Sequence, residues 1–423
     1  MIFFLLAFLV LVGFQQIRTY LSPPIPKAEE GPGEAKPNNE KSTYRLPVLT
    51  KPTVEPSLLV LGDESTTMRV VFDPRGAGVR RVTLNRFRAA DEDGRPTSEP
   101  LDVVPASSNT DEPAYLIYHH DHSEAKRPVE TLGTVNWQTA GVVTEEVDGQ
   151  PCQVVRFTAT VGGLRYIKTY SLAPGDYHLG LEVKIEKPAE SKGKSRVRYQ
   201  LAGARGLPTE GKWFASRFRN SLIALEDQRG SIDRDLQELQ KIVLWGNGNS
   251  IGNTDRSFIR YAAIECQYFA SAIVVANDQP VGQDRGFLAS ARPTLESGVI
   301  HGRIKSVTKD RITIVTHDGR MTETVYLTPG DEGRWQGLGE RSGPVAILYR
   351  NLGYDSELGQ APKVALEVRT GQAAESTHAL WEDDITIRVN TKPFDLEAGQ
   401  SVTHRYLLYN GPVKPSLLKH LGG

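Results

Sequence analysis

Apolar and polar residues alternate along most of the chain after residue 57, in short runs separated by turn sequences. The alternation is clearest in residues 164–172, where Leu164, Tyr166, Lys168 and Tyr170 share one face. Successive side chains of a strand point to opposite faces, so this pattern predicts a half-buried strand. Asp-Pro, Pro-Gly-Asp, Gly-Gly and Asp-Gly turns separate many similar runs. We therefore predict an all-β sandwich of antiparallel strands.

Two segments give more specific expectations. The stretch YAAIECQYFASAIV (261–274) is apolar or aromatic at every even position, which predicts one strand with Cys266 and Tyr268 pointing into the core. Helical patterns are scarce, and the best candidate is SIDRDLQELQKI (231–242), whose apolar residues fall on one helical face after Ser231.

A second β unit interrupts the first. Residues 299–333 alternate through three strands joined by Lys309-Asp310 and Asp318-Gly319 turns, a pattern typical of the start of a small SH3-like or OB-like barrel. The sandwich pattern resumes in residues 379–412. We therefore divide the folded part into a sandwich over 57–295, an inserted β-barrel over 296–375, and the last sandwich strands with the start of a helix over 376–423. Hinges at Ser297-Gly298 and at 371–376 would let the insert fold on its own.

The N-terminus predicts a membrane anchor. Residues 2–14 are continuously apolar and the apolar character extends to Leu21, so a helix over 2–21 would span about 30 Å, the thickness of a hydrocarbon core. No basic residue precedes Ile2 and no small-residue cleavage site follows, so an uncleaved anchor over 1–21 is favoured over a signal peptide. The Pro-, Glu- and Lys-rich residues 22–56 predict a flexible linker.

Charge and cysteine content narrow the picture slightly. The 50 basic and 51 acidic residues balance, which argues against nucleic acid as a partner. Cys152 and Cys266 both lie in predicted strands, where a free cysteine usually behaves as a small buried hydrophobic residue. A disulfide between them is the less favoured alternative.

No catalytic chemistry stands out. His119, His120, Asp121 and His122 form the one histidine cluster, but no second cluster completes a metal site, so a polar turn is the favoured interpretation. The loop GNGNSIGN (246–253) lacks the lysine and helix of a phosphate-binding loop. We find no pair of carboxylates with assignable roles. We therefore expect no catalytic, cofactor-binding or metal-binding residues, no cofactor, and no enzymatic activity.

Four segments resemble the periplasmic domain of the YidC-type membrane protein insertases. Residues 267–270 (QYFA) look like that family's Lys-Tyr-Phe-Ala signature, and residues 399–422 are similar to its last periplasmic strand, in which Tyr-x-Leu-Tyr-x-Gly-Pro precedes a helix. Residues 72–87 resemble its early strand pair, and residues 163–187 its central hairpin. The segments occur in the family's order, behind an anchor and a linker.

The resemblance implies a β-supersandwich of the galactose mutarotase-like type, followed by a short C-terminal helix. It also implies a periplasmic region that assists the insertion and folding of inner-membrane proteins, with Sec translocon subunits and nascent membrane proteins as partners. The protein would sit in the bacterial inner membrane through a single N-terminal span, with its bulk in the periplasm. The family's five-helix insertase core is not found in residues 1–423, so we expect these residues alone not to insert membrane proteins.

Two other functions stay open. One is an envelope-anchored scaffold whose inserted barrel binds a protein partner. The other is a carbohydrate-binding or aldose-epimerase-like protein, because the same fold is shared with aldose epimerases. An epimerase needs a general acid and a general base across a sugar-sized cleft, and the scattered histidines provide no identifiable pair.

Overall fold

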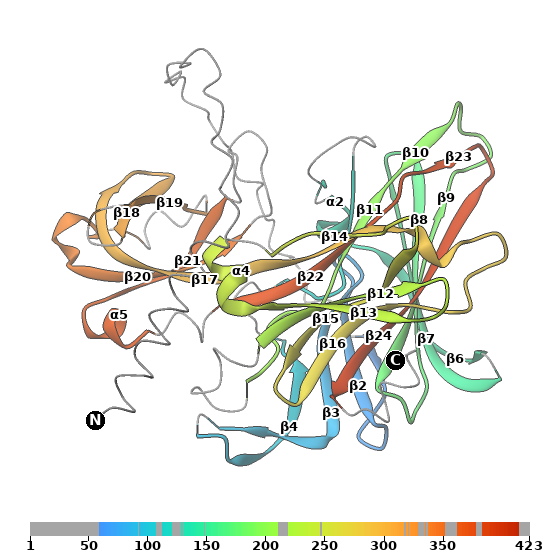
Figure 1. Ribbon diagram of the computed structural model, residues 1–423, viewed down its shortest axis with the longest axis horizontal. Coiled ribbons are helices and arrows are strands. Elements are labelled where there is room, and N and C mark those ends of the chain that lie inside the picture. Colours follow the sequence, from blue (N-terminus) through green and yellow to red (C-terminus); the bar gives the residue numbers. More distant parts are fainter. Residues whose placement is uncertain are drawn as a thin grey trace, which may run out of the picture. The chain divides into compact units, whose positions relative to one another are not determined.

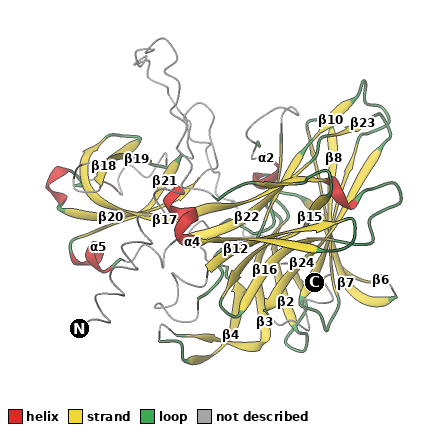
Figure 2. Cartoon of the chain, viewed as in Figure 1, coloured by secondary structure: helices red, strands yellow, loops and turns green. Residues whose placement is uncertain are grey.

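Strands dominate the protein (Figures 1 and 2). The computed structural model describes residues 59–91, 93–106, 112–120, 128–129, 131–147, 149–209, 219–245, 248–316, 319, 321–328, 335, 337–351, 362–377 and 383–413. Within these ranges, none of the helices combines the length and the apolar character needed to cross a membrane. The predicted anchor over 1–21, the linker over 22–56 and the C-terminal helix all lie outside the described residues.

A nine-stranded antiparallel sheet, here called the main sheet, forms one layer of a sandwich. Its strand order is β13-β12-β15-β16-β24-β9-β8-β7-β6. In chain order the strands are β6 (Gln138–Val147), β7 (Gln150–Val161), β8 (Leu164–Leu172), β9 (His178–Glu186), β12 (Arg219–Asp227), β13 (Ile232–Glu238), β15 (Ser257–Cys266), β16 (Phe269–Val275) and β24 (Ser401–Pro412).

Two groups of strands cover the inner face of the main sheet. One is a four-stranded sheet of β1 (Leu59–Leu61), β2 (Met68–Asp73), β3 (Gly78–Ala90) and β4 (Pro96–Val104). The other contains β5 (Ile117–His119), β11 (Tyr199–Ala202), β14 (Ile251–Gly252), β22 (Asp384–Thr391) and the first part of β17 (Leu288–Val307).

Buried aromatic residues join the two layers. The Phe72 ring on β2 lies 4.8 Å from the Tyr170 ring on β8, and the Tyr199 hydroxyl on β11 lies 2.7 Å from the Tyr406 hydroxyl on β24. Burying such large side chains between sheets is the main source of stability in a sandwich. The predicted all-β sandwich is therefore confirmed.

The remaining elements are short. The strands β10 (Ser195–Val197) and β23 (Phe394–Leu396) pair with each other. The described helices are α2 (Thr131–Thr134), η2 (Arg285–Phe287), α4 (Leu239–Trp245), η5 (Glu340–Ser342) and α5 (Gln372–Ser376).

Five strands close into the small barrel that the sequence predicts. They pair in the ring β17-β18-β19-β21-β20, and β17 pairs with both β18 and β20, which closes the ring. The other four are β18 (Arg311–Thr316), β19 (Met321–Tyr326), β20 (Pro344–Asn351) and β21 (Lys363–Thr370). Only the β19–β21 pair is parallel among these contacts. A closed ring leaves no free edge strand in the barrel itself.

One continuous strand, β17, belongs to both the sandwich and the barrel. Its residues up to Ser297 pair with β22, and from Ser297 onward it pairs with β20. Glu296 is the extra residue of a β-bulge in the β22 ladder, between Leu295 and Ser297. The predicted hinge at Ser297-Gly298 is therefore wrong, because the ladder of β17 with β20 runs through both residues.

The bulge directs Glu296 into a buried cluster of charges. Its carboxylate lies 2.7 Å from Arg388 Nη2 and 3.6 Å from Arg205 Nη1, and only 2 % of the Glu296 side chain is exposed. Arg205 also binds Glu112, which accepts a further hydrogen bond from Arg350 on β20 at 3.1 Å. Burial alone would raise the pKa of Glu112, but Arg205 and Arg350 outweigh it and hold that pKa below its usual range. The cluster thus ties the first barrel strands to the sandwich.

The hairpin predicted in residues 163–187 is confirmed, with β8 and β9 antiparallel across the Pro-Gly-Asp turn. As the alternation indicates, Lys168 points inward and is fully buried. Its Nζ donates to the backbone oxygens of Ala77 and Tyr115, each at 2.7 Å. Burial lowers the pKa of Lys168 well below its ordinary value. These hydrogen bonds link the main sheet to two loops of the opposite layer.

The predicted helix over 231–242 is wrong for most of its length. Residues 232–238 form the edge strand β13, which pairs with β12 along its whole length, and only Leu239–Trp245 is helical. Leu236 is 52 % exposed, whereas Leu239 and Ile242 are buried. The apolar spacing that suggested one helical face thus mixes Leu236, an exposed strand residue, with Leu239 and Ile242, two buried helix residues. Pairing with β12 outweighs the helical propensity of residues 232–238.

The segment 261–274 is not one strand but a hairpin. The strand β15 ends at Cys266, a turn of two residues follows, and β16 begins at Phe269, which pairs with Cys266. Tyr268 lies in the turn and is 53 % exposed, so the prediction that it is buried in the core is wrong. Gln267 adopts φ of 26°, which permits the reversal. Alternation could not reveal the turn, because no glycine, proline or asparagine marks it.

The buried His404 on β24 is expected to make the free energy of unfolding depend on pH. Its ring stacks on Phe287 with centroids 4.0 Å apart, and its Nδ1 lies 2.9 Å from the Tyr199 hydroxyl. Burial lowers the pKa of His404 from 6.5 to about 3. As pH falls below about 6.5, the unfolded chain takes up this proton first, so stability falls until pH about 3, by at most about 1.4 kcal/mol per pH unit.

Urea unfolding measured from pH 7 to pH 4 checks this. His404→Phe keeps an aromatic ring against Phe287 but cannot titrate, so its stability should fall less steeply with decreasing pH than that of the natural protein. Equal slopes would show that other groups cause the acid sensitivity.

Candidate functional site

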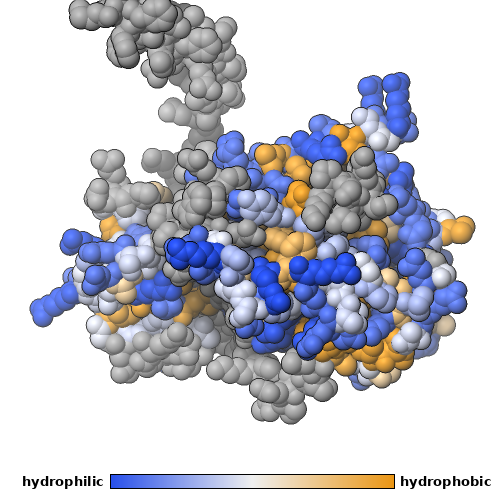
Figure 3. All heavy atoms as spheres, turned by 90° about the horizontal axis from the view of Figure 1, so that it is seen from below, coloured by the Kyte–Doolittle hydropathy of each residue, from blue (hydrophilic) through white to orange (hydrophobic). Residues whose placement is uncertain are grey.

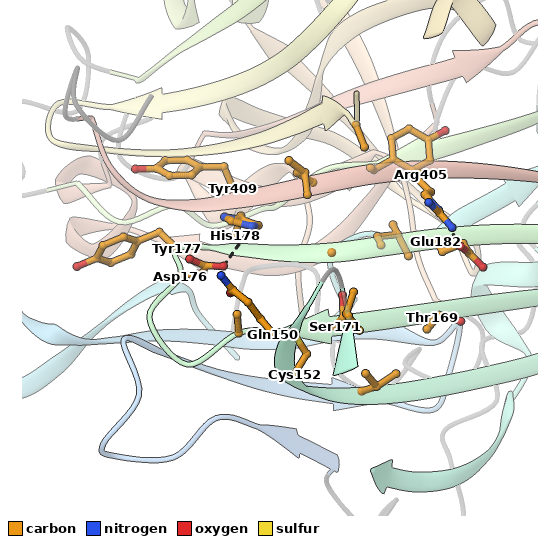
Figure 4. Close-up of a pocket in the computed structure, with 18 of the residues that line it drawn as sticks. Gln150, Cys152, Thr169, Ser171, Asp176, Tyr177, His178, Glu182, Arg405 and Tyr409 are labelled. Carbon is orange, nitrogen blue, oxygen red and sulfur yellow. Dashed lines mark hydrogen bonds and ion pairs between the residues drawn. The ribbon is translucent and has the colours of Figure 1, made fainter. Parts of the chain in front are cut away.

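A groove of about 880 Å³ lies on the outer face of the main sheet, the face turned away from the sandwich core (Figure 4). Its lining comes from β7, β8, the turn after β8, β9 and β24, with Val147 of β6, Arg86 of β3 and the segment after β16. This volume falls within the range of ordinary ligand sites. On the face shown in Figure 3, hydrophobic patches also lie between hydrophilic residues, so an apolar surface alone does not mark a site.

The floor of the groove belongs to a row of residues that crosses the main sheet at right angles to the strands. Direct cross-strand partners place them side by side. The row, here called the cross-strand row, consists of Tyr261, Val274, Leu407, Gly180, Ser171, Val154 and Val143. Outer faces of sheets are normally polar, so a row without a charged side chain is unusual for this position.

Small residues keep the middle of the row low. Gly180 on β9 stands opposite Ser171 on β8, and a Cβ at position 180 would come within 2.3 Å of the Ser171 Oγ. Leu407 and Val154 stand on either side of this pair. The space beside Gly180 is therefore taken by the Ser171 hydroxyl, and the floor at this pair rises no higher than a serine side chain.

Charged pairs lie at both ends of the groove (Figure 4). At one end Arg405 Nε is 3.1 Å from Glu182, and Arg405 Nη1 is 3.1 Å from Asp278. At the other end His178 Nε2 is 3.3 Å from Asp176, beside Tyr177 and Tyr409. These groups offer both donors and acceptors to a ligand that lies on the uncharged floor.

An ion pair crosses the row near its edge. Arg156 on β7 and Glu145 on β6 start on opposite sides of the Val154–Val143 pair, and their side chains meet at 2.5 and 2.6 Å. The hydrogen bonds from Arg156 are the largest cause that lowers the pKa of Glu145. Val154 is accordingly only 1 % exposed, while Val143 on the edge strand is 43 % exposed.

The histidine and the glutamate of the groove lining do not lie side by side. His178 and Glu182 are the histidine and a glutamate of its lining, and they stand four residues apart on one strand. At about 3.3 Å per residue this is about 13 Å, too far for both to act on adjacent oxygens of one sugar ring. His178 is also paired with Asp176, and Glu182 with Arg405.

The histidine cluster weighed in the sequence does not form a site in the described part of the chain. His119 lies on β5 and His120 is buried just after it, while Asp121 and His122 lie outside the described residues. Among the described residues no group of three or more His, Cys, Asp or Glu could hold a metal ion. Of the glycine-rich loop, residues 251–252 form the short strand β14.

The two cysteines are separate. Cys152 lies on β7 in the groove lining and Cys266 on β15 faces the core, and both are buried. Burial is the main cause that raises the pKa of the Cys266 thiol. A disulfide between them is therefore absent, as the favoured interpretation of the sequence has it.

Comparison with known protein families assigns most of the sandwich. A family model described as the YidC periplasmic domain matches residues 64–309. The chain belongs to this family. The match extends from β2 across the start of the barrel and includes both the Lys168 strand and the 261–274 hairpin. Of the four segments that carried the resemblance in the sequence, three fall within it. No curated protein matches the chain.

Solved structures with a similar fold are distant relatives in sequence. A galactose mutarotase-like protein from Clostridium acetobutylicum aligns with 82 % of this chain and 94 % of its own, at 8 % identity and a TM-score of 0.37. A galactose mutarotase related enzyme from Lactobacillus acidophilus aligns with 85 % of this chain and 98 % of its own, at 8 % identity and a TM-score of 0.32. Such low identities carry no function across.

Sequence reasoning missed the groove, although one signal was present. Residues 406–411 (YLLYNG) and 269–275 (FASAIVV) carry no charge on either face. A strand whose outer face meets solvent usually carries charged residues at alternate positions. A strand without charges on either face therefore indicates that its outer face is covered or binds a ligand.

Proposed function

We propose that this protein is the periplasmic part of a YidC-type membrane protein insertase, and that its outer groove holds an extended segment of a membrane protein during insertion. The observation that carries the proposal is the cross-strand row within a groove whose ends bear charged pairs. Apolar and small residues suit the apolar side chains of a membrane segment, and the charged ends suit a polypeptide backbone.

The dimensions of the row fit an extended chain. The row crosses seven strands, and its six spacings of about 4.8 Å give about 29 Å. The four row residues that line the groove, Leu407, Gly180, Ser171 and Val154, span about 14 Å of this, the length of about four extended residues. A monosaccharide would fill only a part of this length. The groove therefore favours a polypeptide over the carbohydrate alternative, and the separation of His178 from Glu182 favours binding over catalysis.

In this proposal the protein is held in the bacterial inner membrane by residues 1–21, its bulk lies in the periplasm, and Sec translocon subunits deliver the segment. The uninterrupted apolar run of residues 2–14 and the match to a periplasmic domain support this arrangement. The chemistry of insertion itself is assigned to a polar groove among membrane-spanning helices, which a single span does not form.

Photo-crosslinking in membranes tests the proposal. A benzophenone amino acid at Thr169 in the groove should cross-link to membrane proteins while they are being inserted. The same group at Met321, which is 52 % exposed on the barrel, is the matched control. Cross-links to client proteins from position 321 alone would favour the scaffold alternative and overturn the proposal.

A filled groove should lose these cross-links. Gly180→Leu combined with Ser171→Ala places a side chain over the floor and removes the hydroxyl that it would meet at 2.3 Å. We expect cross-linking from Thr169 to fall at least fivefold in the double variant and to persist in Ser171→Ala alone. Undiminished cross-linking in the filled groove, with unfolding unchanged, would show that clients bind elsewhere.

A further inference from the structure

The main sheet ends at β6, whose outer edge has no strand beside it among the described residues (Figure 1). In an edge strand every second residue directs its backbone N–H and C=O away from the sheet. Val142 and Val143 point to opposite faces and are 39 % and 43 % exposed. The strand is thus open along its edge and on both faces at this point.

The regular part of this edge is short and well defined. Residues 142–147 pair one for one with residues 150–155, whereas a bulge interrupts the ladder between Thr139 and Val142. Gly141 adopts φ of 98° there, a conformation that favours glycine. The bulge therefore limits a partner strand to the six residues after it.

We propose that β6 binds its client by strand addition: an extended segment pairs with residues 142–147, places β-branched side chains beside Val142 and Val143, and sets a basic residue beside Glu146. Main-chain hydrogen bonds supply much of the affinity in such pairing, and side-chain positions supply selectivity. This inference rests on the proposed function, because it names how the same client polypeptide is held.

The charges on β6 select a basic residue. Glu145 is already bound to Arg156. Glu146 is exposed and has no ion-pair partner in the part of the chain that the structure describes. A lysine or arginine directly opposite or diagonal to Glu146 on an added strand would be a favourable cross-strand pair.

The same charges argue against a second copy of this chain as the occupant. If two β6 strands paired antiparallel about a twofold axis at Glu145, Glu145 of one copy would stand directly opposite Glu145 of the other, and the two Glu146 residues would be diagonal neighbours. The two glutamates of both copies would then gather around the symmetry axis, where like charges destabilise the pair.

The edge is continuous with the groove. Val143 is the last residue of the cross-strand row and stands opposite Val154 of the groove lining. An added strand therefore extends the row by one position, and it runs at right angles to a segment that lies along the groove floor. The opposite edge strand, β13, exposes Leu236 and carries Asp233, Arg234 and Asp235, and it lies at the far end of the sheet.

Hydrogen exchange on the full chain tests the proposal with defined probes. The first is an eight-residue peptide of alternating valine and threonine with one lysine. The second is the same peptide N-methylated at alternate residues, which cannot pair with a strand, and the third has glutamate in place of lysine. We expect the first peptide alone to slow amide exchange in residues 142–147 at least tenfold, without protection of residues 232–238.

Two variants make the result specific. Val142→Lys with Val143→Lys should abolish the protection, because lysines on the edge oppose both pairing and the basic peptide. Leu236→Lys on β13 is the matched control and should leave the protection unchanged. Both positions are exposed, so thermal unfolding should stay as in the natural protein.

The outcomes separate this inference from the proposed function. Strand addition would be overturned if the methylated peptide protected residues 142–147 as well as the first peptide does. It would also be overturned if the first peptide protected residues 232–238, or if it protected neither strand. Protection of β6 that rises with protein concentration without peptide would identify a second copy as the occupant and overturn it as well. If cross-links from Thr169 persist while β6 stays unprotected, the groove function stands and the edge proposal fails.

Discussion

Replacing Glu296 with leucine is expected to lower the free energy of unfolding by about 3–5 kcal/mol. The substitution removes the carboxylate that lies 2.7 Å from Arg388 and 3.6 Å from Arg205. The Arg205 side chain is 1 % exposed and that of Arg388 is 14 % exposed, so water cannot replace the lost partner. Arg205 keeps Glu112, but Arg388 loses Glu296 and keeps the neutral Gln200 as a hydrogen-bond partner. Removing one partner of a buried ion pair costs much more than the pair itself contributes.

Urea unfolding followed by fluorescence and by circular dichroism measures the effect. Glu367→Leu is the matched control, since Glu367 also binds an arginine, Arg369, but its side chain is 46 % exposed. We expect a change of less than about 1 kcal/mol for the control, as for other surface ion pairs. Similar losses for the two variants would mean that the buried cluster contributes no more than a surface pair.

The importance of Glu296 could not be inferred from the sequence. It occupies the extra position of a bulge, and only that geometry turns its side chain toward two arginines from distant parts of the chain. From the sequence, the residues of β17 after Leu295 look like a simple continuation of the alternating strand. A bulge without glycine has no reliable sequence signal, so the alternation of apolar and polar residues could not reveal the bulge at Glu296.

Local patterns succeeded where the turn was marked by its own residues. The β8–β9 hairpin has clean alternation and a Pro-Gly-Asp turn, and the structure confirms both strands and the inward position of Lys168. The closed barrel likewise follows from alternating strands with Asp-containing turns. The errors at 231–242 and 261–274 arose where a strand ended without a turn residue.

The groove depends on long-range register and was therefore out of reach. Val154, Gly180 and Leu407 become neighbours only because three antiparallel pairings bring them into one line. A shift of one residue in any of these ladders would turn the residue to the core face. The alternation in the sequence shows which residues of a strand share a face. It does not show which residues of neighbouring strands stand beside one another.

Removal of the barrel should leave a folded sandwich only when the cut preserves Glu296. Ser297 on β17 and Asp384 on β22 are direct cross-strand partners, so a short loop can join the two strands as a hairpin. We expect replacement of residues 298–382 by Gly-Asn-Gly to give a monomeric protein with one cooperative unfolding transition. This cut keeps Glu296 and also Asp383, whose backbone oxygen accepts a hydrogen bond from Arg219 Nη1.

The cut suggested by the sequence boundaries should fail. Replacing residues 296–375 with a Gly-Ser linker of the same three-residue length removes Glu296 and leaves Arg205 and Arg388 buried without that partner. We expect this second protein to be insoluble or to unfold without cooperativity, as judged by size-exclusion chromatography and thermal melting. If both proteins fold equally well, the buried cluster is not what couples the barrel to the sandwich. If both fail, the barrel is an integral part of the sandwich fold and not an insertion into it.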